Sequence, residues 1–288
     1  MSSAFIDLHS HTNASDGTLT PAELIAMAER VHLSALSITD HDTFDGYEQA
    51  LPFARAAGLD LVRGIELNSR LSLDGSSHPR YVHVLVYFPL HEPTPGFKTW
   101  LAEQQADRRS RNTKLAKALQ DAGVDITLAE VEARGRSLAG RPHFARILME
   151  KGYATNFEDA FHKYLGEDAP SYVERDSNTT EEVIAIARRG GGIPVVAHPI
   201  RIGLQRLQEP VVLSRFKEAG LGGLEVIHSD HPPALQLHYA ALAEEFGLLP
   251  TGGSDFHGAV KPDIELGTGR DHNVHVPLAY LDALRRSN

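Results

Sequence analysis

Two histidines separated by a single residue follow an apolar run near the start of the chain. The run Phe5-Ile-Asp-Leu precedes His9-Ser-His11. Side chains two positions apart on a strand point to the same side, so both imidazoles can converge on one ion. Imidazoles with nearby carboxylates suit Mn²⁺, Fe²⁺ or Zn²⁺. The pattern therefore predicts a metal site at the end of a strand.

The same combination of an apolar run and a metal-type residue recurs along most of the chain. Because one histidine beside an apolar run is usually a packing residue, it is the recurrence that favours a common site. In parallel α/β barrels, functional groups gather where strands end and loops begin. The residues concerned are Asp40, His41 and Asp42 after 36–39, Glu66 after 61–65, His83 within 81–88, His198 after 193–197, and Asp255 and His257 after 248–254.

The composition is that of a soluble enzyme. The 288 residues are 42% hydrophobic, which is enough for one large α/β domain or a domain with an insertion. There is no cysteine, which excludes a disulfide framework and a thiolate metal site. No apolar run is long enough to cross a membrane, and the first strand begins too early to leave room for a signal peptide. We expect a cytoplasmic protein that does not bind membranes.

The net charge of −10 is unevenly distributed. Residues 98–151 carry eleven Lys and Arg against seven Asp and Glu, a balance of +4, which leaves −14 for the rest. An acidic body argues against a general nucleic-acid-binding surface. The basic segment could face an anionic substrate or be a solvated helix face.

Strand-like runs alternate with helical stretches, which predicts parallel βα units. Capping-box spacings predict helix starts at Thr20, Thr127 and Thr179. Residues 98–122 and 139–165 read as helices without strong strand signals, and 72–80 reads as a hairpin turn. We therefore expect an interrupted barrel, with 1–99 as its first part, 100–175 as a helical insertion and 176–288 as its second part.

These motifs together resemble the PHP (polymerase and histidinol phosphatase) family of metal-dependent phosphoesterases. The resemblance implies an α/β fold, a distorted (β/α)₇ TIM-like barrel, with two or three metal ions. Within the family the chain resembles the stand-alone bacterial 3′,5′-nucleoside bisphosphate phosphatases, whose helical insertion carries a segment similar to Gly140-Arg-Pro-His-Phe-Ala145. The matching motifs are His9-Ser-His11 with Asp16, Thr39-Asp-His41, Gly64-Ile-Glu66, His83, Ala197-His-Pro199 and Gly253-Ser-Asp-Phe-His257.

The resemblance also implies how the metal ligands are grouped. One ion would be held by His9, His11, Glu66 and Asp255. Glu66 would bridge to a second ion, completed by His83 and His198. Asp16, His41 and His257 would hold the third. His78 is an alternative to His83, which we prefer because it lies within a strand-like run.

The charge of such a site favours a phosphate ester. Three divalent ions and the carboxylates of Asp16, Glu66 and Asp255 leave a net charge of about +3, which would attract a phosphate monoester. We expect a hydroxide bound to metals held by Glu66, His198 and Asp255 to attack phosphorus in line. The cofactors would be two or three divalent ions, with Mn²⁺ favoured and Fe²⁺, Zn²⁺ or Mg²⁺ as alternatives.

Residues that contact or support the site are less well marked. Arg141, His143 and Arg201 are candidate phosphate ligands, because a guanidinium can hold a phosphate through two hydrogen bonds. Asp7 and Asp40 are candidates to orient a ligating imidazole. Two further groups receive no site role: His228 and His231, which the family pattern does not need, and Phe97 and Trp100, which we expect in the core.

The resulting hypothesis is a hydrolase that removes the 3′-phosphate from a nucleoside 3′,5′-bisphosphate such as pAp. The partner would be this small nucleotide, with no membrane and no obligate protein partner. The alternatives are 5′-to-3′ trimming of short RNA ends, a histidinol-phosphate-type phosphatase, an amidohydrolase, and a non-catalytic module that binds metal and nucleotide.

Overall fold

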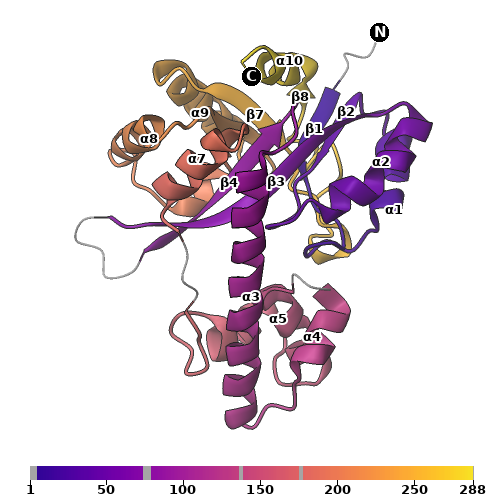
Figure 1. The fold of residues 1–288 in the computed structure, drawn as a ribbon, viewed down its shortest axis with the longest axis vertical. Helices are drawn as coiled ribbons and strands as arrows, with labels where there is room; N and C mark the ends of the chain where they lie inside the picture. Colours follow the sequence, from indigo (N-terminus) through magenta and orange to yellow (C-terminus); the bar gives the residue numbers. More distant parts are fainter. Residues whose placement is uncertain (1–4, 74–78, 136–138, 175–177, 288) are drawn as a thin grey trace.

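A nearly closed barrel of eight strands forms the body of the protein in the computed structural model (Figure 1). The structure describes residues 5–73, 79–135, 139–174 and 178–287. The strands are ordered β7-β6-β5-β4-β3-β2-β1-β8. Their bounds are β1 Phe5–Ser10, β2 Ala35–Ile38, β3 Asp60–Leu71, β4 Arg80–Phe88, β5 Ile193–Val196, β6 Gly223–His228, β7 Leu249–Gly253 and β8 Val276–Pro277.

The barrel closes where β1 meets the residues that follow β7. The backbone N–H of Asp255 donates to the carbonyl of His9 at 2.8 Å, and that of His11 donates to the carbonyl of Phe256 at 2.9 Å. Gly253 makes this approach possible, since a Cβ there would lie 2.3 Å from the backbone nitrogen of His9. The closure brings the first and last metal motifs of the chain together.

The expected barrel is confirmed, and β1–β2, β2–β3, β5–β6 and β6–β7 pair in parallel as expected, but the sheet also contains antiparallel pairs. β3 and β4 form a long antiparallel hairpin, with Leu71 opposite Arg80, and β4 also runs antiparallel to β5. β3 and β4 are antiparallel because the connection between them is short, whereas parallel neighbours need a crossover of a dozen or more residues. The predicted turn itself, including His78, lies partly outside the described residues.

Helices cover the outside of the barrel, and their starts follow the predicted caps. Thr20 and Thr179 accept hydrogen bonds in complete capping boxes, and Thr127 pairs reciprocally with Glu130. Figure 1 shows α1 and α2 at the right of the barrel and α7, α8 and α9 at its left. The bounds are α1 Pro21–Arg30, α2 Asp45–Ala57, α7 Thr180–Arg189, α8 Glu209–Glu218, α9 Pro233–Glu245 and α10 Leu278–Arg286.

A helical module extends from the barrel between β4 and α7 (Figure 1). None of the described residues from 89 to 174 is in a strand. The module has its own apolar cluster, which includes Leu119, Val131, Phe144 and Leu148. Its helices are α3 Pro95–Asp121, α4 Leu128–Gly135, α5 Arg141–Glu150 and α6 Phe157–Ala160, followed by a π-helical turn, Phe161–Leu165.

Buried polar contacts join this module to the barrel next to the predicted ligands. Arg108 of α3 forms an ion pair with Asp42, and both side chains are nearly buried. Gln105 donates to the carbonyl of Asp42 at 2.8 Å. Arg146 of α5 donates to the carbonyl of Asp16 at 2.8 Å. The module therefore contacts the loops that carry two predicted ligands, Asp16 and His41.

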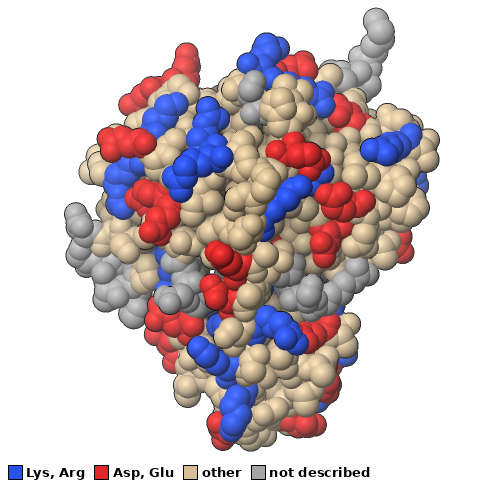
Figure 2. Space-filling view, viewed as in Figure 1, with Lys and Arg blue, Asp and Glu red and all other residues tan. Residues whose placement is uncertain are grey.

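The outer surface mixes both signs of charge. Figure 2 shows Lys and Arg interspersed with Asp and Glu over the visible face, without a large basic patch. None of the described helices is long and apolar enough to cross a membrane. The cytoplasmic location stays a prediction.

We expect Gly253→Ala to destabilise the protein by about 2 kcal/mol or more, because the new methyl group would meet backbone atoms that cannot move without opening the barrel. Urea unfolding followed by circular dichroism measures this. Gly96→Ala is the matched control: it lies in the first turn of α3, nothing would contact its Cβ within 4 Å, and its stability should be unchanged or slightly higher. Equal stability of the two variants would contradict the assigned barrel closure.

Candidate metal centre

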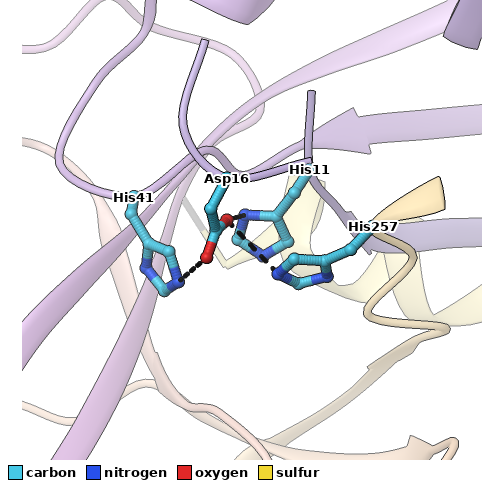
Figure 3. Close-up of side chains that lie close together, drawn as sticks. All are labelled: His11, Asp16, His41 and His257. Carbon is cyan, nitrogen blue, oxygen red and sulfur yellow. Dashed lines mark ion pairs between the residues drawn. The ribbon is translucent and has the colours of Figure 1, made fainter. Parts of the chain in front are cut away.

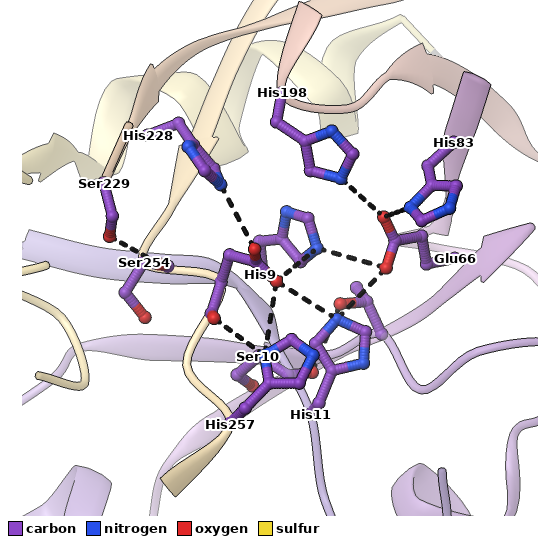
Figure 4. A network of polar contacts seen from close by, with 12 residues as sticks. His9, Ser10, His11, Glu66, His83, His198, His228, Ser229, Ser254 and His257 are labelled. Atoms are coloured by element: carbon purple, nitrogen blue, oxygen red, sulfur yellow. Dashed lines mark hydrogen bonds and ion pairs between the residues drawn. The ribbon is translucent and has the colours of Figure 1, made fainter. Parts of the chain in front are cut away.

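The nine side chains predicted to bind metal lie together at one end of the barrel. β3 contributes Glu66, and β4 contributes His83 from its N-terminal part, which reaches this end because β4 runs antiparallel. Figure 4 shows most of these side chains pointing toward one another. The other seven lie on β1 or in the loops after β1, β2, β5 and β7: His9, His11, Asp16, His41, His198, Asp255 and His257.

Glu66 is at the centre of the cluster and its two carboxylate oxygens face different sets of histidines. Oε1 lies 2.8 Å from His83 Nδ1 and 3.0 Å from His198 Nε2. Oε2 lies 3.1 Å from His11 Nε2 and 3.4 Å from His9 Nε2. Glu66 is 1% exposed, so this carboxylate interacts with imidazoles rather than with solvent. The arrangement is suited to a ligand that bridges two ions.

Asp255 faces Glu66 across the same histidines. Its Oδ1 lies 3.4 Å from His9 Nε2 and 3.5 Å from His11 Nε2. Its backbone adopts a φ of +58°, a left-handed conformation that non-glycine residues rarely adopt. The backbone hydrogen bond to His9 that closes the barrel holds Asp255 in this position.

Asp16 forms the centre of a third group (Figure 3). Its Oδ1 lies 3.3 Å from His257 Nε2 and 3.8 Å from His11 Nδ1, and its Oδ2 lies 3.8 Å from His41 Nε2. His257 donates its Nδ1–H to the carbonyl of Asp255 at 2.8 Å, which directs the Nε2 lone pair toward Asp16. The Asp16 group overlaps the groups around Glu66 and Asp255, because His11 contacts all three carboxylates.

The buried nitrogens show that these residues fit divalent cations. His9 Nε2, His11 Nε2 and His41 Nδ1 are buried without a hydrogen-bond partner. A buried polar atom in this state is costly unless an ion takes its lone pair. These nitrogens lie 3.4, 3.1 and 3.3 Å from Glu66 Oε2, which matches the separation of two ligands that share an ion about 2.1 Å from each. Ligation by the nine residues stays a prediction.

Several protonation states suit metal ligands, with His9 as the exception: burial opposes its protonation, but the carboxylates of Glu225, Glu66 and Asp255 outweigh burial and raise the pKa of His9 well above its usual value. Burial lowers the pKa of His41 and that of His198 to about 3, so both imidazoles are neutral near pH 7. Burial alone would raise the pKa of Asp16 and that of Glu66, but the surrounding histidines outweigh it and hold both pKa values well below the usual range. Neutral imidazoles and ionised carboxylates bind metal without first losing a proton.

Glu225 supports the cluster from inside the barrel, and the sequence analysis missed it. His9 donates its Nδ1–H to Glu225 Oε1 at 2.8 Å, and the backbone N–H of His198 donates to Oε2 at 2.6 Å. Burial opposes ionisation, but His9 and His228 lower the pKa of Glu225 to about 2. One carboxylate thus orients two predicted ligands. The feature of the sequence that could have identified Glu225 is its position as a single acidic residue within the apolar run Gly223–His228.

Asp7 and Asp40 have a different role from the one considered for them. Asp7 accepts from the Ser254 hydroxyl at 2.5 Å and from the backbone N–H of Gly267 at 2.8 Å. Asp40 accepts from the backbone N–H of Thr12 at 2.8 Å and from the Ser15 hydroxyl at 2.6 Å. No hydrogen bond between either carboxylate and a ligand imidazole occurs among the described contacts, so both organise the loops that carry ligands.

His228 lies close to the cluster as a hydrogen-bond donor. The backbone N–H of Asp230 donates to its Nδ1 at 2.9 Å, so Nδ1 is an acceptor and the N–H of the ring is on Nε2. That Nε2 lies 3.4 Å from Asp255 Oδ2. Although atoms of His9, His228 and Asp255 lie within 4.8 Å of one another, this protonation leaves His228 to orient Asp255.

Two cationic side chains donate hydrogen bonds to Oδ2 of Asp255. Arg201 donates through Nη1 at 2.8 Å and Lys261 donates through Nζ at 2.7 Å. Arg201 also donates through Nε to Asp230 at 2.8 Å. Arg201 was predicted near the site, whereas nothing in the sequence marked Lys261. Both line the cleft and can present positive charge to an anion there.

A cleft of about 340 Å³ lies between the metal cluster and the helical module. Arg141 and His143 line its module side, as does Arg108. The Arg141 Nη1 contacts the carbonyl of Leu165 at a long 3.4 Å, so most of its donors stay available for a ligand. His143 accepts from the Gly140 N–H through Nδ1 at 3.0 Å and caps α5, and burial lowers its pKa to about 4.

Comparison with known proteins identifies the relatives of this chain. The PHP domain family matches residues 7–165. The 5′-3′ exoribonuclease Rnm of Escherichia coli is 34% identical over 265 residues, covering 91% of this chain and 87% of that protein. The 3′,5′-nucleoside bisphosphate phosphatase of Chromobacterium violaceum is 30% identical over 270 residues, covering 93% and 92%.

A solved structure is similar over almost the whole chain. It is that of a protein described as a metal-dependent phosphoesterase from Bifidobacterium adolescentis. The two share 30% sequence identity and superimpose with a TM-score of 0.80, which covers 98% of this chain and 95% of the other. The similarity includes the helical module as well as the barrel.

We expect Glu225→Gln to lower the affinity for Mn²⁺ about tenfold, because the substitution removes the negative charge that orients His9. Calorimetric titration of the metal-free variant with Mn²⁺ measures this. Glu209→Gln is the matched control, since Glu209 also pairs with a histidine, His238, at 2.7 Å but outside the cluster. If both variants bind Mn²⁺ like the original chain, Glu225 does not support the ligands.

Proposed function

The chain belongs to the PHP domain family and is a metal-dependent phosphoesterase, and from this premise we propose that it removes the 3′-phosphate from nucleoside 3′,5′-bisphosphates. For adenosine 3′,5′-bisphosphate the products would be AMP and phosphate. The bond that breaks joins phosphorus to the 3′ oxygen, and water supplies the oxygen that replaces it. The Chromobacterium violaceum relative carries this activity in its name.

One observation carries the proposal: the cleft offers two separate places for anions. The cluster around Glu66 is the first, and Arg201 and Lys261 add positive charge at its edge. Arg141 on the module is the second. A substrate with phosphates at both ends of a ribose can use both places, whereas a simple monoester uses only the first.

The side chains of the cleft would act mainly by binding and orienting the substrate. Divalent ions held by the nine ligands would supply Lewis acidity to the phosphoryl oxygens and lower the pKa of coordinated water. Arg201 and Lys261 would hold oxygens of the 3′-phosphate and release Asp255 Oδ2 as they do so. Arg141 would hold the 5′-phosphate. The imidazole-rich ligand set supports Mn²⁺, with Fe²⁺ and Zn²⁺ as alternatives.

A second candidate function is 5′-to-3′ exoribonuclease activity. The Escherichia coli relative with this name matches the chain as well as the phosphatase does. The same bond to the 3′ oxygen would break. The difference is that the phosphorus of RNA carries the next nucleotide in place of a free oxygen. The two reactions therefore require the same anion sites and differ only in the space beside the metal cluster.

We expect metal-stripped protein reconstituted with Mn²⁺ to release one phosphate from adenosine 3′,5′-bisphosphate and to leave 5′-AMP. Malachite green detection and chromatography of the nucleotide measure both products. His198→Ala should lower the rate at least 100-fold, because His198 is a predicted ligand beside Glu66. His238→Ala is the matched control, since His238 pairs with Glu209 outside the cleft.

The outcomes separate the candidate functions. Faster cleavage of a 5′-phosphorylated RNA oligonucleotide than of the bisphosphate would favour the exoribonuclease. If a folded, metal-loaded protein released neither phosphate from the bisphosphate nor nucleoside monophosphates from the RNA, both assignments would be wrong. Histidinol phosphate would then be the next substrate to test. Metal binding without any hydrolysis would indicate a binding module.

We expect Arg141→Gln to lower kcat/KM for adenosine 3′,5′-bisphosphate about 30-fold, because a charge-assisted contact to the 5′-phosphate is lost. With adenosine 3′-monophosphate, which lacks that phosphate, the effect should be smaller than threefold. Arg134→Gln is the control, because Arg134 lies in the same module but pairs with Glu150 on the surface. An equal loss of kcat/KM with both substrates would show that Arg141 does not bind the 5′-phosphate.

A further inference from the structure

The part of the cleft farther from the metal cluster is built on the β3–β4 hairpin. Glu66, Asn68 and Arg70 alternate along β3 and all line the cleft. In the antiparallel register Asn68 is opposite His83, and Arg70 is opposite Tyr81. Residues two apart on a strand are separated by about 7 Å. Tyr81 therefore lies about 7 Å beyond His83 along β4, a distance that a ribose can span.

Four aromatic side chains surround this outer region: Tyr81 of the barrel, and Phe157, Phe161 and Tyr172 of the module. We call them the aromatic wall. All four line the cleft and are only partly buried. Phe157 and Phe161 pack with part of their surface against the apolar cluster of the module. Phe157 and Phe161 therefore each pack one part of the ring against the core and present another part to the cleft.

The contacts of the wall hold its rings in place across the gap between barrel and module. The hydroxyls of Tyr81 and Tyr172 lie 3.0 Å apart. The Arg141 guanidinium lies 5.3 Å from the ring centroid of Tyr81 and 5.7 Å from that of Phe161. Arg141 is therefore stacked among the rings, and its edge can still donate to an anion.

Packing against the core does not explain why these four aromatic side chains also line the cleft. Phe97 and Trp100, which the sequence predicted to lie in the core, pack there and do not line the cleft. The wall instead exposes aromatic surface inside an otherwise polar cleft, beside a candidate 5′-phosphate ligand. Flat apolar surface next to an arginine is the chemistry that binds a nucleobase.

We infer that the aromatic wall is a nucleobase subsite, on which the base of the substrate stacks while its ribose spans the step from Tyr81 to His83. The inference rests on the proposed function and adds to it a requirement for a base. Stacking needs only the flat face that every base has, so the subsite would accept all four bases. Ribose phosphates without a base would bind the same anion sites but lose this contact.

Phe157→Leu is the sharpest test, because Phe157 lines the cleft and has no described contact with Arg141. We expect KM for adenosine 3′,5′-bisphosphate to rise about tenfold, equivalent to about 1.4 kcal/mol, with kcat changed less than twofold. With the base-free 1,4-anhydroribitol 3,5-bisphosphate, both parameters should match those of the original chain. Phe161→Leu should raise KM similarly.

Tyr164→Leu is the matched control, because Tyr164 packs on the same apolar cluster but does not line the cleft. It should leave KM for both substrates unchanged. If Phe157→Leu raised KM equally for the substrate with a base and the one without, the effect would be on the shape of the cleft. The subsite would then be overturned. Equal kcat/KM of the original chain for both substrates would also overturn it, while leaving the proposed function intact.

Equilibrium binding separates a failure of the subsite from a failure of the proposed reaction. Calorimetry with the Mn²⁺-loaded protein compares AMP with ribose 5-phosphate, and neither measurement requires turnover. AMP should bind at least tenfold more tightly, and Phe157→Leu should remove most of that difference. Equal affinities would overturn the subsite even in a protein that hydrolyses nothing.

Discussion

The interaction on which the rest of the structure depends is the burial of the Glu66 carboxylate among imidazoles. A buried charge is costly unless it is compensated, and here His83 and His198 make hydrogen-bond contacts with the carboxylate in place of solvent. The histidines around Glu66 come from strands and loops that are far apart in the sequence. They reach one carboxylate because β1 to β5 are neighbours in the same sheet. The five nitrogens within 3.4 Å of it belong to His9, His11, His41, His83 and His198.

This cluster also depends on the antiparallel direction of β4. A parallel β4 would enter the sheet from the opposite end, and an early residue such as His83 would lie away from the ligands. The hairpin places His83 opposite Asn68, two residues beyond Glu66. The same hairpin continues outward to Arg70 and Tyr81, so one element connects the metal cluster to the outer cleft.

The helical module is an integral part of the site. Its contacts with Asp42 and with the carbonyl of Asp16 act on loops that carry ligands. It also supplies Arg141 and most of the aromatic wall. The predicted metal ligands belong to the barrel, whereas under the proposed function the module would recognise the rest of the substrate. Two relatives with different activities in their names are consistent with this division of roles.

Sequence alone determined the features that depend on short-range physical rules. Alternation along strands placed His9 and His11 on one side, and capping boxes marked the starts of α1, α4 and α7. The helical insertion and the hairpin were predicted in the same way. Only the tertiary structure decided which distant groups meet. Glu225 contacts His9 across 216 residues, and Ser254 contacts Asp7 across 247. Such partners leave no periodic signal, because barrel closure selects them by position in space.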